Sequence, residues 1–327
     1  MSSEHTAIGG YFELDRGGGR GLGQLEQCHG FQSARAAVFA VLSQAPVDVL
    51  WAPNYVCGAL NDALRASGAS VKRYSLTNEL GVPGDLEVRA RDRIVVVDYF
   101  GLASRSVRAS IVRHGESKVI VDAAQSLFFP YADAATTIFS PRKFVGVPDG
   151  GFVSSRATIP SPESADEDAS IRRCAHLLKR LAGDVEGGYA DFQRAETSLS
   201  DMRMRSVSRL TLALLGRVDG EAVQRRRVEN YRLLQELLEG AFEIPPLPNG
   251  CVPLCCPVAV DSASIVRPYL AEQRIYTPNY WPDAEIPASD AVALRLRDFT
   301  VYLPCDQRYG ESHMRRVART ILASRQL

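Results

Sequence analysis

One short stretch, Val119-Ile120-Val121-Asp122-Ala123-Ala124-Gln125-Ser126, is the best guide to fold and chemistry in this chain of 327 residues. It begins with β-branched apolar residues, as a strand buried on both faces does, and runs directly into a carboxylate. A carboxylate that ends a buried strand is costly unless something pairs with it. Asp122 therefore either caps the following loop or holds a proton on the ring nitrogen of a cofactor.

Strands and helices alternate on both sides of this stretch, from about residue 33 to residue 153. We predict helices over residues 34–42 and 57–66, and strands over residues 47–51, 70–74, 94–97, 118–121, 136–139 and 152–154. Strands that are apolar on both faces and separated by helices are typical of a mostly parallel sheet flanked by helices. Ligands of such α/β proteins bind beyond the carboxyl ends of the strands, where Asp122 lies.

The second half of the chain begins with a loop rich in Ser, Pro and acidic residues over residues 159–168. Helical periodicity then covers residues 172–181, 201–215 and 222–238. A tail of strand, helix, strand and helix occupies residues 252–260, 265–273, 300–303 and 312–322. We therefore predict a large domain over residues 1–205, including an N-terminal arm, and a smaller α/β domain over residues 206–327.

The composition argues against several classes of protein. Lys plus Arg and Asp plus Glu both number 38, so the formal net charge is zero and nothing favours nucleic acid or an anionic membrane. The seven cysteines include no Cys-x-x-Cys pair and the five histidines are scattered, so we expect neither a metal site nor a disulfide framework. Neither a signal peptide nor a membrane-spanning run is recognisable, and we expect a cytoplasmic protein.

A second informative segment, Phe139-Ser140-Pro141-Arg142-Lys143-Phe144, follows another predicted strand. Lysines in such places usually lie at the surface, but the apolar neighbours favour the neutral amine that condenses with carbonyl groups. Ser140 offers a hydroxyl to a phosphate, and Gly150-Gly151 permits a tight turn behind the lysine. Ser33 is a candidate N-cap for the helix over residues 34–42, whose first turn can bind an anion.

Together these segments resemble the DegT–DnrJ–StrS family of sugar aminotransferases, which use pyridoxal phosphate and have the aspartate-aminotransferase-like fold. The resemblance continues along nearly the whole chain through further segments: Ser33-Ala34-Arg35, Trp51-Ala52-Pro53-Asn54-Tyr55, Asp98-Tyr99-Phe100-Gly101, Arg226-Arg227-x-x-Asn230, Arg274-Ile275-Tyr276-Thr277 and Leu303-Pro304. It implies an α/β fold of type I among pyridoxal-phosphate-dependent transferases, with a large domain built on a mostly parallel sheet and a smaller C-terminal α/β domain.

The resemblance also implies a role for each matching catalytic residue. Lys143 would form the Schiff base with pyridoxal phosphate and move protons between the substrate and the cofactor. Asp122 would pair with the pyridinium nitrogen, and Gln125 would contact the phenolic oxygen of the ring.

The phosphate and the ring face are assigned in the same way. Ser33, Ala34 and Ser140 would bind the phosphate. The nearest candidate for the aromatic side chain that stacks on the ring is Tyr55, and the spacing also allows Cys57.

Three features depart from the family pattern. Ile138 lies where many members have a serine five residues before the lysine, which leaves Ser140 as the nearest hydroxyl. Residues 201–206 occupy the region where many members carry a Gly-x-Asn-x-Arg stretch that reaches the partner subunit. Cys305 follows Leu303-Pro304, where a histidine is usual. These departures indicate a divergent member with altered substrate or partner contacts.

The activity implied is transfer of an amino group, from glutamate, to a keto sugar that is linked to a nucleotide, by a homodimer with active sites at its interface. Two alternatives remain: a lyase or dehydratase that uses pyridoxal phosphate, and a binding protein that kept the fold and lost catalysis. Family dehydratases replace the lysine with histidine, so Lys143 favours transamination. A dinucleotide-dependent oxidoreductase has little support, because the glycines at residues 17–23 follow no strand.

Overall fold

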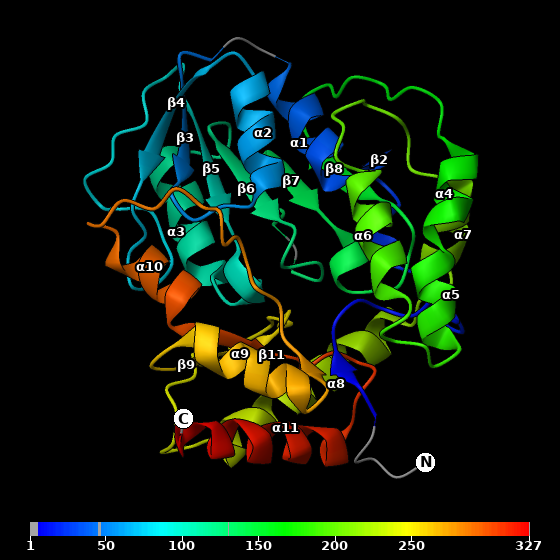
Figure 1. The fold of residues 1–327 in the computed structure, drawn as a ribbon. Helices are drawn as coiled ribbons and strands as arrows, with labels where there is room; N and C mark the ends of the chain where they lie inside the picture. The colour runs from blue at the N-terminus through cyan, green and yellow to red at the C-terminus, as the bar shows by residue number, and fades with distance from the viewer. Residues whose placement is uncertain (1–5, 45–46, 130, 327) are drawn as a thin grey trace.

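The computed structural model describes residues 6–44, 47–129 and 131–326 (Figure 1). Its described apolar side chains form two buried clusters. The larger surrounds a seven-stranded sheet, and the smaller lies among the C-terminal helices and strands. The predicted boundary between residues 205 and 206 stays a prediction; Val207, Leu215 and Val223 pack in the larger cluster, whereas Ile8 packs in the smaller.

The seven-stranded sheet confirms the prediction of an α/β fold with a mostly parallel sheet. Its strands from one edge to the other are β2 (His29–Phe31), β8 (Gly151–Ser155), β7 (Thr136–Phe139), β6 (Val119–Ala123), β5 (Arg93–Val97), β3 (Val49–Pro53) and β4 (Ser70–Tyr74). The strands from β7 to β4 run parallel, and β8 runs antiparallel to both of its neighbours. All five residues of β6 are buried, as the apolar run predicts for a central parallel strand.

Helices cover this sheet. Helices α1 (Ala34–Leu42) and α2 (Gly58–Ala66) pack side by side, and α3 (Ser104–His114) packs against β5 and β6 (Figure 1). An N-cap residue precedes each of the first two helices, Ser33 before α1 and Cys57 before α2. The side chain of each cap accepts a hydrogen bond from a backbone amide in the first turn of the helix.

The strand register brings several chain segments to one edge of the sheet. Val97 is paired with Asp122, Ala123 with Phe139, and Phe139 with Phe152. Phe31 is paired with Gly151, so β2 ends at this same edge. The residues that follow β2, β5, β6 and β7 therefore meet where ligands bind in such folds.

A group of helices lies beyond the β2 edge of the sheet: α4 (Glu167–Arg173), α5 (Ala175–Leu181), α6 (Tyr189–Thr197) and α7 (Arg209–Leu215) (Figure 1). The predicted helix over residues 201–215 is wrong for its first half. Backbone amides and carbonyls there pair across the chain instead: Glu163 N donates to Met204 O (2.7 Å), and Ser206 N donates to Glu163 O (2.8 Å). Helix α7 begins only where the Ser208 hydroxyl caps it.

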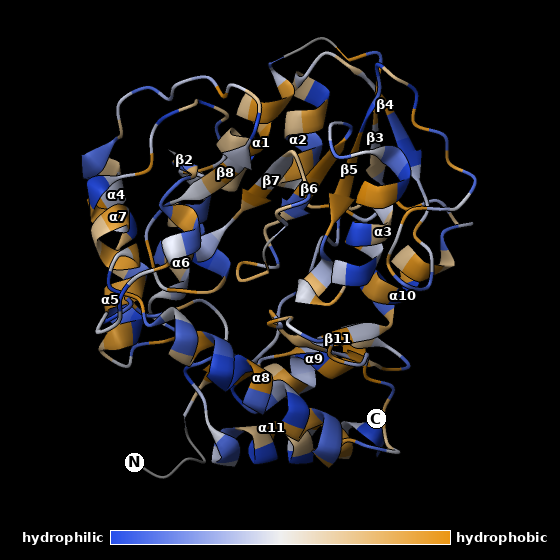
Figure 2. Ribbon diagram, turned by 180° about the vertical axis from the view of Figure 1, so that it is seen from behind, coloured by the Kyte–Doolittle hydropathy of each residue, from blue (hydrophilic) through white to orange (hydrophobic). Residues whose placement is uncertain are grey.

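The C-terminal residues form the smaller unit, with α8 (Gly220–Leu237), β9 (Cys256–Ala259), α9 (Ala263–Glu272), α10 (Ala291–Asp298), β11 (Thr300–Leu303) and α11 (Glu311–Ala323). Strands β9 and β11 pair antiparallel. Hydrophilic and hydrophobic residues alternate around α8 and α11, which is the pattern of amphipathic helices (Figure 2). Among the described residues no helix has the length and apolarity needed to cross a membrane.

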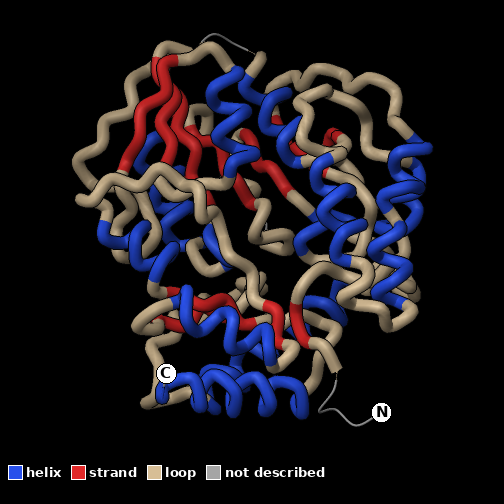
Figure 3. The backbone as a smooth tube through the Cα atoms, viewed as in Figure 1, coloured by secondary structure: helices blue, strands red, loops and turns tan. Residues whose placement is uncertain are grey.

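The N-terminal segment belongs spatially to this C-terminal unit. Strand β1 (Ile8–Gly9) pairs in parallel with β10 (Ile275–Tyr276), beside the other strands of the unit (Figure 3). Gly9 N also donates to the Tyr309 hydroxyl at 2.8 Å, and Arg180 of α5 donates to Gly9 O at 2.7 Å. This segment thus connects the helix group to the C-terminal unit.

Candidate active site

Lys143 lies in a tight turn directly after β7. The turn is a 3-10 helix, Pro141–Lys143, closed by hydrogen bonds from Lys143 N to Ser140 O (3.2 Å) and from Phe144 N to Pro141 O (2.8 Å). Proline suits the first position of such a turn because it needs no amide hydrogen there. The side chains of Phe144 and Val145 are fully buried, whereas Lys143 is partly exposed. The turn therefore presents the lysine at the carboxyl edge of the sheet.

Asp122 occupies the neighbouring strand β6 and is almost fully buried. One carboxylate oxygen accepts a hydrogen bond from Ala124 N at 3.0 Å. Burial raises the pKa of Asp122, and the nearby Lys143 ammonium and the Ala124 amide oppose that rise. Lysine and carboxylate are therefore close enough to interact electrostatically, as their places after adjacent strands predict.

Gln125 has one satisfied and one unsatisfied polar atom. Its Oε1 accepts a hydrogen bond from Phe100 N at 3.0 Å, and its Nε2 is buried with no hydrogen-bond partner. Phe100 has a left-handed backbone (φ 60°), which aims its amide at the glutamine. A buried amide nitrogen without a partner is costly, so this site suits a ligand that offers an acceptor. The phenolic oxygen of pyridoxal phosphate is such an acceptor.

The first turn of α1 lies against the start of β8. A Cβ added at Gly151 would come within 2.2 Å of Ala34 N and of the Ser33 carbonyl carbon, so no larger residue fits there. Gly150 donates its backbone N–H to Gln32 O at 2.9 Å, and its φ is positive, at 116°. The glycine pair therefore lets β8 approach the N-terminus of α1, which is the kind of place where phosphate binds.

The three residues predicted to bind phosphate are in two groups. Ser33 caps α1, because its Oγ accepts from Ala36 N at 3.2 Å, and Ala34 is the first residue of that helix. Ser140 is buried at the end of β7, and its side chain makes no capping bond to the turn that holds Lys143. The β2–β8–β7 register carries both groups to the same edge.

Tyr55 and Cys57 lie in different surroundings. The Tyr55 ring is fully buried in an aromatic cluster, stacked at 6.0 Å on Tyr99, and its hydroxyl donates to Tyr280 O at 3.0 Å. Burial raises the pKa of the Cys57 thiol, while Lys143 acts in the opposite direction and Asp122 adds to the rise. Both candidate catalytic groups thus influence the Cys57 thiol, which also accepts from Leu60 N at 3.3 Å, whereas the described contacts of Tyr55 lie within the aromatic cluster.

Three arginines that could bind an anionic group, Arg35, Arg142 and Arg308, are largely occupied by ion pairs. Arg35 pairs with Asp62, and Arg142 pairs with Glu196. Arg308 donates to Asp306 at 2.7 Å and holds the N-terminal segment by further bonds to Tyr11 O and Gly10 O. Of these three, only Arg142 has a buried nitrogen without a partner, its Nε.

The glycine-rich segment near the N-terminus packs against the start of α8. Gly21 forms a parallel bridge with Asp219, and a Cβ added at Gly19 would lie 2.3 Å from the Asp219 Cα. These glycines therefore allow a close approach of two backbones, and no described α-helix starts within the segment to bind a dinucleotide.

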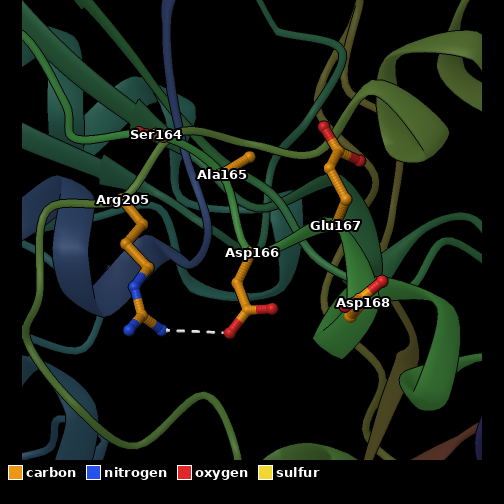
Figure 4. Close-up of a pocket in the computed structure, with 6 residues that line it drawn as sticks. All are labelled: Ser164, Ala165, Asp166, Glu167, Asp168 and Arg205. Carbon is orange, nitrogen blue, oxygen red and sulfur yellow. Dashed lines mark hydrogen bonds and ion pairs between the residues drawn. The ribbon is translucent and has the colours of Figure 1, made fainter.

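Lys143 lines neither of two surface cavities. The first, of about 390 Å³, is lined by the residues drawn in Figure 4, where Arg205 pairs with Asp166 at 3.4 Å. The second, of about 370 Å³, lies between the N-terminal segment and α8 and includes Gln307. Neither contains a predicted site residue, so the grouping of side chains defines the candidate site.

The fold defined by these elements is that of the sugar aminotransferases. No protein-family model and no curated protein sequence matches this chain. The solved structures that match include the aminotransferase TlmJ from Streptoalloteichus hindustanus, with a TM-score of 0.65 and 17% identity over 92% of this chain and 86% of that one. A DegT DnrJ EryC1 StrS aminotransferase from Brucella abortus matches with a TM-score of 0.62 and 16% identity, over 93% and 87% of the chains.

A third match is the putative sugar aminotransferase Spr1654 from Streptococcus pneumoniae in its PLP-form, with a TM-score of 0.63 and 14% identity, over 94% and 89% of the chains. These likenesses confirm, for the fold, the family resemblance predicted from the sequence.

Proposed function

We propose that this chain is a pyridoxal-phosphate-dependent aminotransferase of fold type I that aminates a keto sugar. One observation supports the proposal: adjacent parallel strands bring Asp122 and the turn of Lys143 to the carboxyl edge of the sheet, and the buried Nε2 of Gln125, three residues after Asp122, has no partner. The fold shared with sugar aminotransferases supports the substrate class. In the same proposal the amino donor is glutamate, the sugar is linked to a nucleotide, and a homodimer works in the cytoplasm.

The residues at this edge fit pyridoxal phosphate. Asp122 would hold a proton at the pyridine nitrogen, and its burial beside a cation suits that partner. Gln125 Nε2 would donate to the phenolic oxygen, since its Oε1 is already taken by Phe100 N. Ser33, the Ala34 amide and Ser140 would bind the phosphate.

When bound, pyridoxal phosphate supplies an electron sink for the carbon next to the transferred nitrogen. Lys143 Nζ would hold the cofactor before substrate arrives, and would then take a proton from the substrate carbon and return it as a general base and acid. Between Tyr55 and Cys57 we favour Cys57 as the residue beside the ring, because its thiol is near both Lys143 and Asp122.

The test is optical. Protein loaded with pyridoxal phosphate should be yellow, and Lys143→Ala should abolish the band. Lys179→Ala is the matched control, because that lysine is half exposed and pairs with Asp191. Glutamate should convert the band to the amine form of the cofactor.

Two results would contradict the proposal in different ways. A protein that takes up no pyridoxal phosphate would refute the cofactor assignment. A yellow protein that ignores amino donors and reacts with a keto sugar would be a lyase instead.

A further inference from the structure

Arg227 of α8 is a fully buried cation. Its Nε donates to Gln307 Oε1 at 2.9 Å, and its other nitrogens donate to Leu254 O (3.0 Å), Pro253 O (3.2 Å) and Phe144 O (3.4 Å). No ion pair to a carboxylate is found for it within the described part of the chain. Burial lowers the pKa of Arg227, against an opposing influence from Asp306.

Burying a guanidinium is expensive, and well-packed apolar residues often stabilise a core at least as well. A purely structural role therefore gives little reason for a cation here. What distinguishes Arg227 is the set of backbone carbonyls that it holds, and these belong to segments far apart in sequence.

One of those carbonyls belongs to Phe144, which directly follows Lys143. Gln307 Nε2 donates to Phe144 O at 2.6 Å, and the Arg227 guanidinium lies 4.7 Å from the centre of the Phe144 ring. The Phe144 amide is held at the same time by Pro141 O. Both sides of the residue next to the lysine are therefore fixed, which limits how the lysine turn can move.

Another carbonyl belongs to Leu254, and its segment reaches the second half of the site. Leu254 N donates to Phe100 O at 2.8 Å, and Phe100 N holds Oε1 of Gln125. Arg227 thus lies on hydrogen-bonded paths to the turn of Lys143 and to the turn that orients Gln125.

We propose that Arg227 and Gln307 are positioning residues that hold the Lys143 turn in a fixed position relative to Asp122 and Gln125. The inference rests on the proposed function for its consequence in catalysis. Its geometrical part concerns the lysine turn alone and can be measured without the cofactor.

Gln307→Glu is the sharpest variant. A glutamate keeps an acceptor for Arg227 Nε and so keeps that cation partnered, but it cannot donate to Phe144 O. Gln235→Glu is the matched control, because Gln235 Nε2 also donates to a backbone carbonyl, that of Pro245, at 3.1 Å, on an exposed face. Arg227→Lys is the conservative companion, since a lysine can reach carbonyls but not all four acceptors.

The first measurement uses protein without cofactor and follows reductive methylation of each lysine by mass spectrometry. We expect Gln307→Glu to change the rate at Lys143 by about threefold to tenfold, the effect of one lost hydrogen bond, and to leave Lys179 unchanged. Gln235→Glu should alter neither rate. Thermal unfolding of each variant checks that the fold is intact.

The second measurement uses protein loaded with pyridoxal phosphate and follows its yellow band against pH. Gln307→Glu should move the midpoint, and kcat should fall while KM for the amino donor holds. Unchanged methylation at Lys143 in a folded Gln307→Glu protein would overturn the positioning role, even if the protein is an aminotransferase. A changed rate in a protein that binds no pyridoxal phosphate would uphold positioning and refute the proposed function.

Discussion

The backbone amide of Phe100 donates to Oε1 of Gln125 at 3.0 Å and thereby decides which end of that side chain is free. The amide group has two ends with opposite hydrogen-bonding character, and only its donor end is left for a ligand. Since Nε2 is buried and unpartnered, the ligand must bring an acceptor.

Gln125→Glu tests this directly. A carboxylate keeps the acceptor for Phe100 N and loses the donor, so the fold should survive while affinity for pyridoxal phosphate falls by about tenfold or more. The measurement is an absorbance titration with the cofactor, with thermal unfolding as the check on the fold. Affinity equal to that of the wild type would remove Gln125 from the site.

Asp122→Asn should lower turnover without lowering the stability of the protein. Burial raises the pKa of Asp122, so replacing a costly buried carboxylate with a neutral amide should leave the protein without cofactor at least as stable at pH 7. Turnover should fall by about 100-fold or more, because asparagine cannot hold a proton at the ring nitrogen. Denaturant unfolding and kcat give the two readouts; near-normal kcat would contradict the proposed role.

Gly151→Ala should damage both the fold and the phosphate site. The new Cβ would meet the backbone of Ser33 and Ala34 at about 2.2 Å, and overpacking of this kind costs about 1–3 kcal/mol or more. Gly58→Ala is the control, because nothing lies within 4 Å of its added Cβ. Urea unfolding should show a loss only for Gly151→Ala, and an equal effect in both would mean that the close approach is unimportant.

Cys57→Ala and Tyr55→Phe should distinguish which of the two residues lies beside the ring of the cofactor. Removing the Cys57 thiol should change the affinity for pyridoxal phosphate and the position of its absorbance band. Removing the Tyr55 hydroxyl should cost about 1 kcal/mol of stability through the lost bond to Tyr280 O, and leave the band in place. A band shift in Tyr55→Phe alone would reverse the assignment.

Stability should depend on pH through His176. Burial lowers the pKa of this histidine to about 4, and Arg142 acts in the same direction. The unfolded chain, with an ordinary histidine pKa near 6.5, binds the proton first, so stability should fall as pH drops from about 6.5 to 4, by up to about 3 kcal/mol. His176→Phe should reduce that dependence, measured by urea unfolding across the window, and His29→Gln, at an exposed site, should not.

Much of the sheet was predictable because local runs of apolar residues mark its strands. The predicted elements over residues 34–42, 70–74, 136–139 and 300–303 match α1, β4, β7 and β11 at both ends. Helices α6 and α10 were missed, and residues 201–208 were wrongly predicted as helix. In that last segment the backbone pairs with Glu163 and Gln32, and such long-range hydrogen bonds leave no local periodicity.

Some residues of the candidate site were likewise indicated by the sequence and others were not. Lys143 and Asp122 were predicted from the apolar strand residues that precede each of them, and the parallel pairing of β6 with β7 carries both segments to one edge of the sheet. Arg227 was noted only as part of the Arg226-Arg227-x-x-Asn230 segment, and Gln307 gave no signal, because the bonds of Gln307 to Arg227 and to Phe144 join residues 80 and 163 positions apart. The choice between Tyr55 and Cys57 depends on side-chain direction, which spacing along the chain does not give.

The pairing of β1 with β10 has a consequence for how the protein is made. Ile8 is synthesised well before Ile275, the residue with which it pairs. The seven-stranded sheet can form before this first segment pairs with β10, because none of the seven strands includes residues 8 and 9. We therefore expect closure of the C-terminal unit to be a late step of folding, since it joins segments more than 260 residues apart.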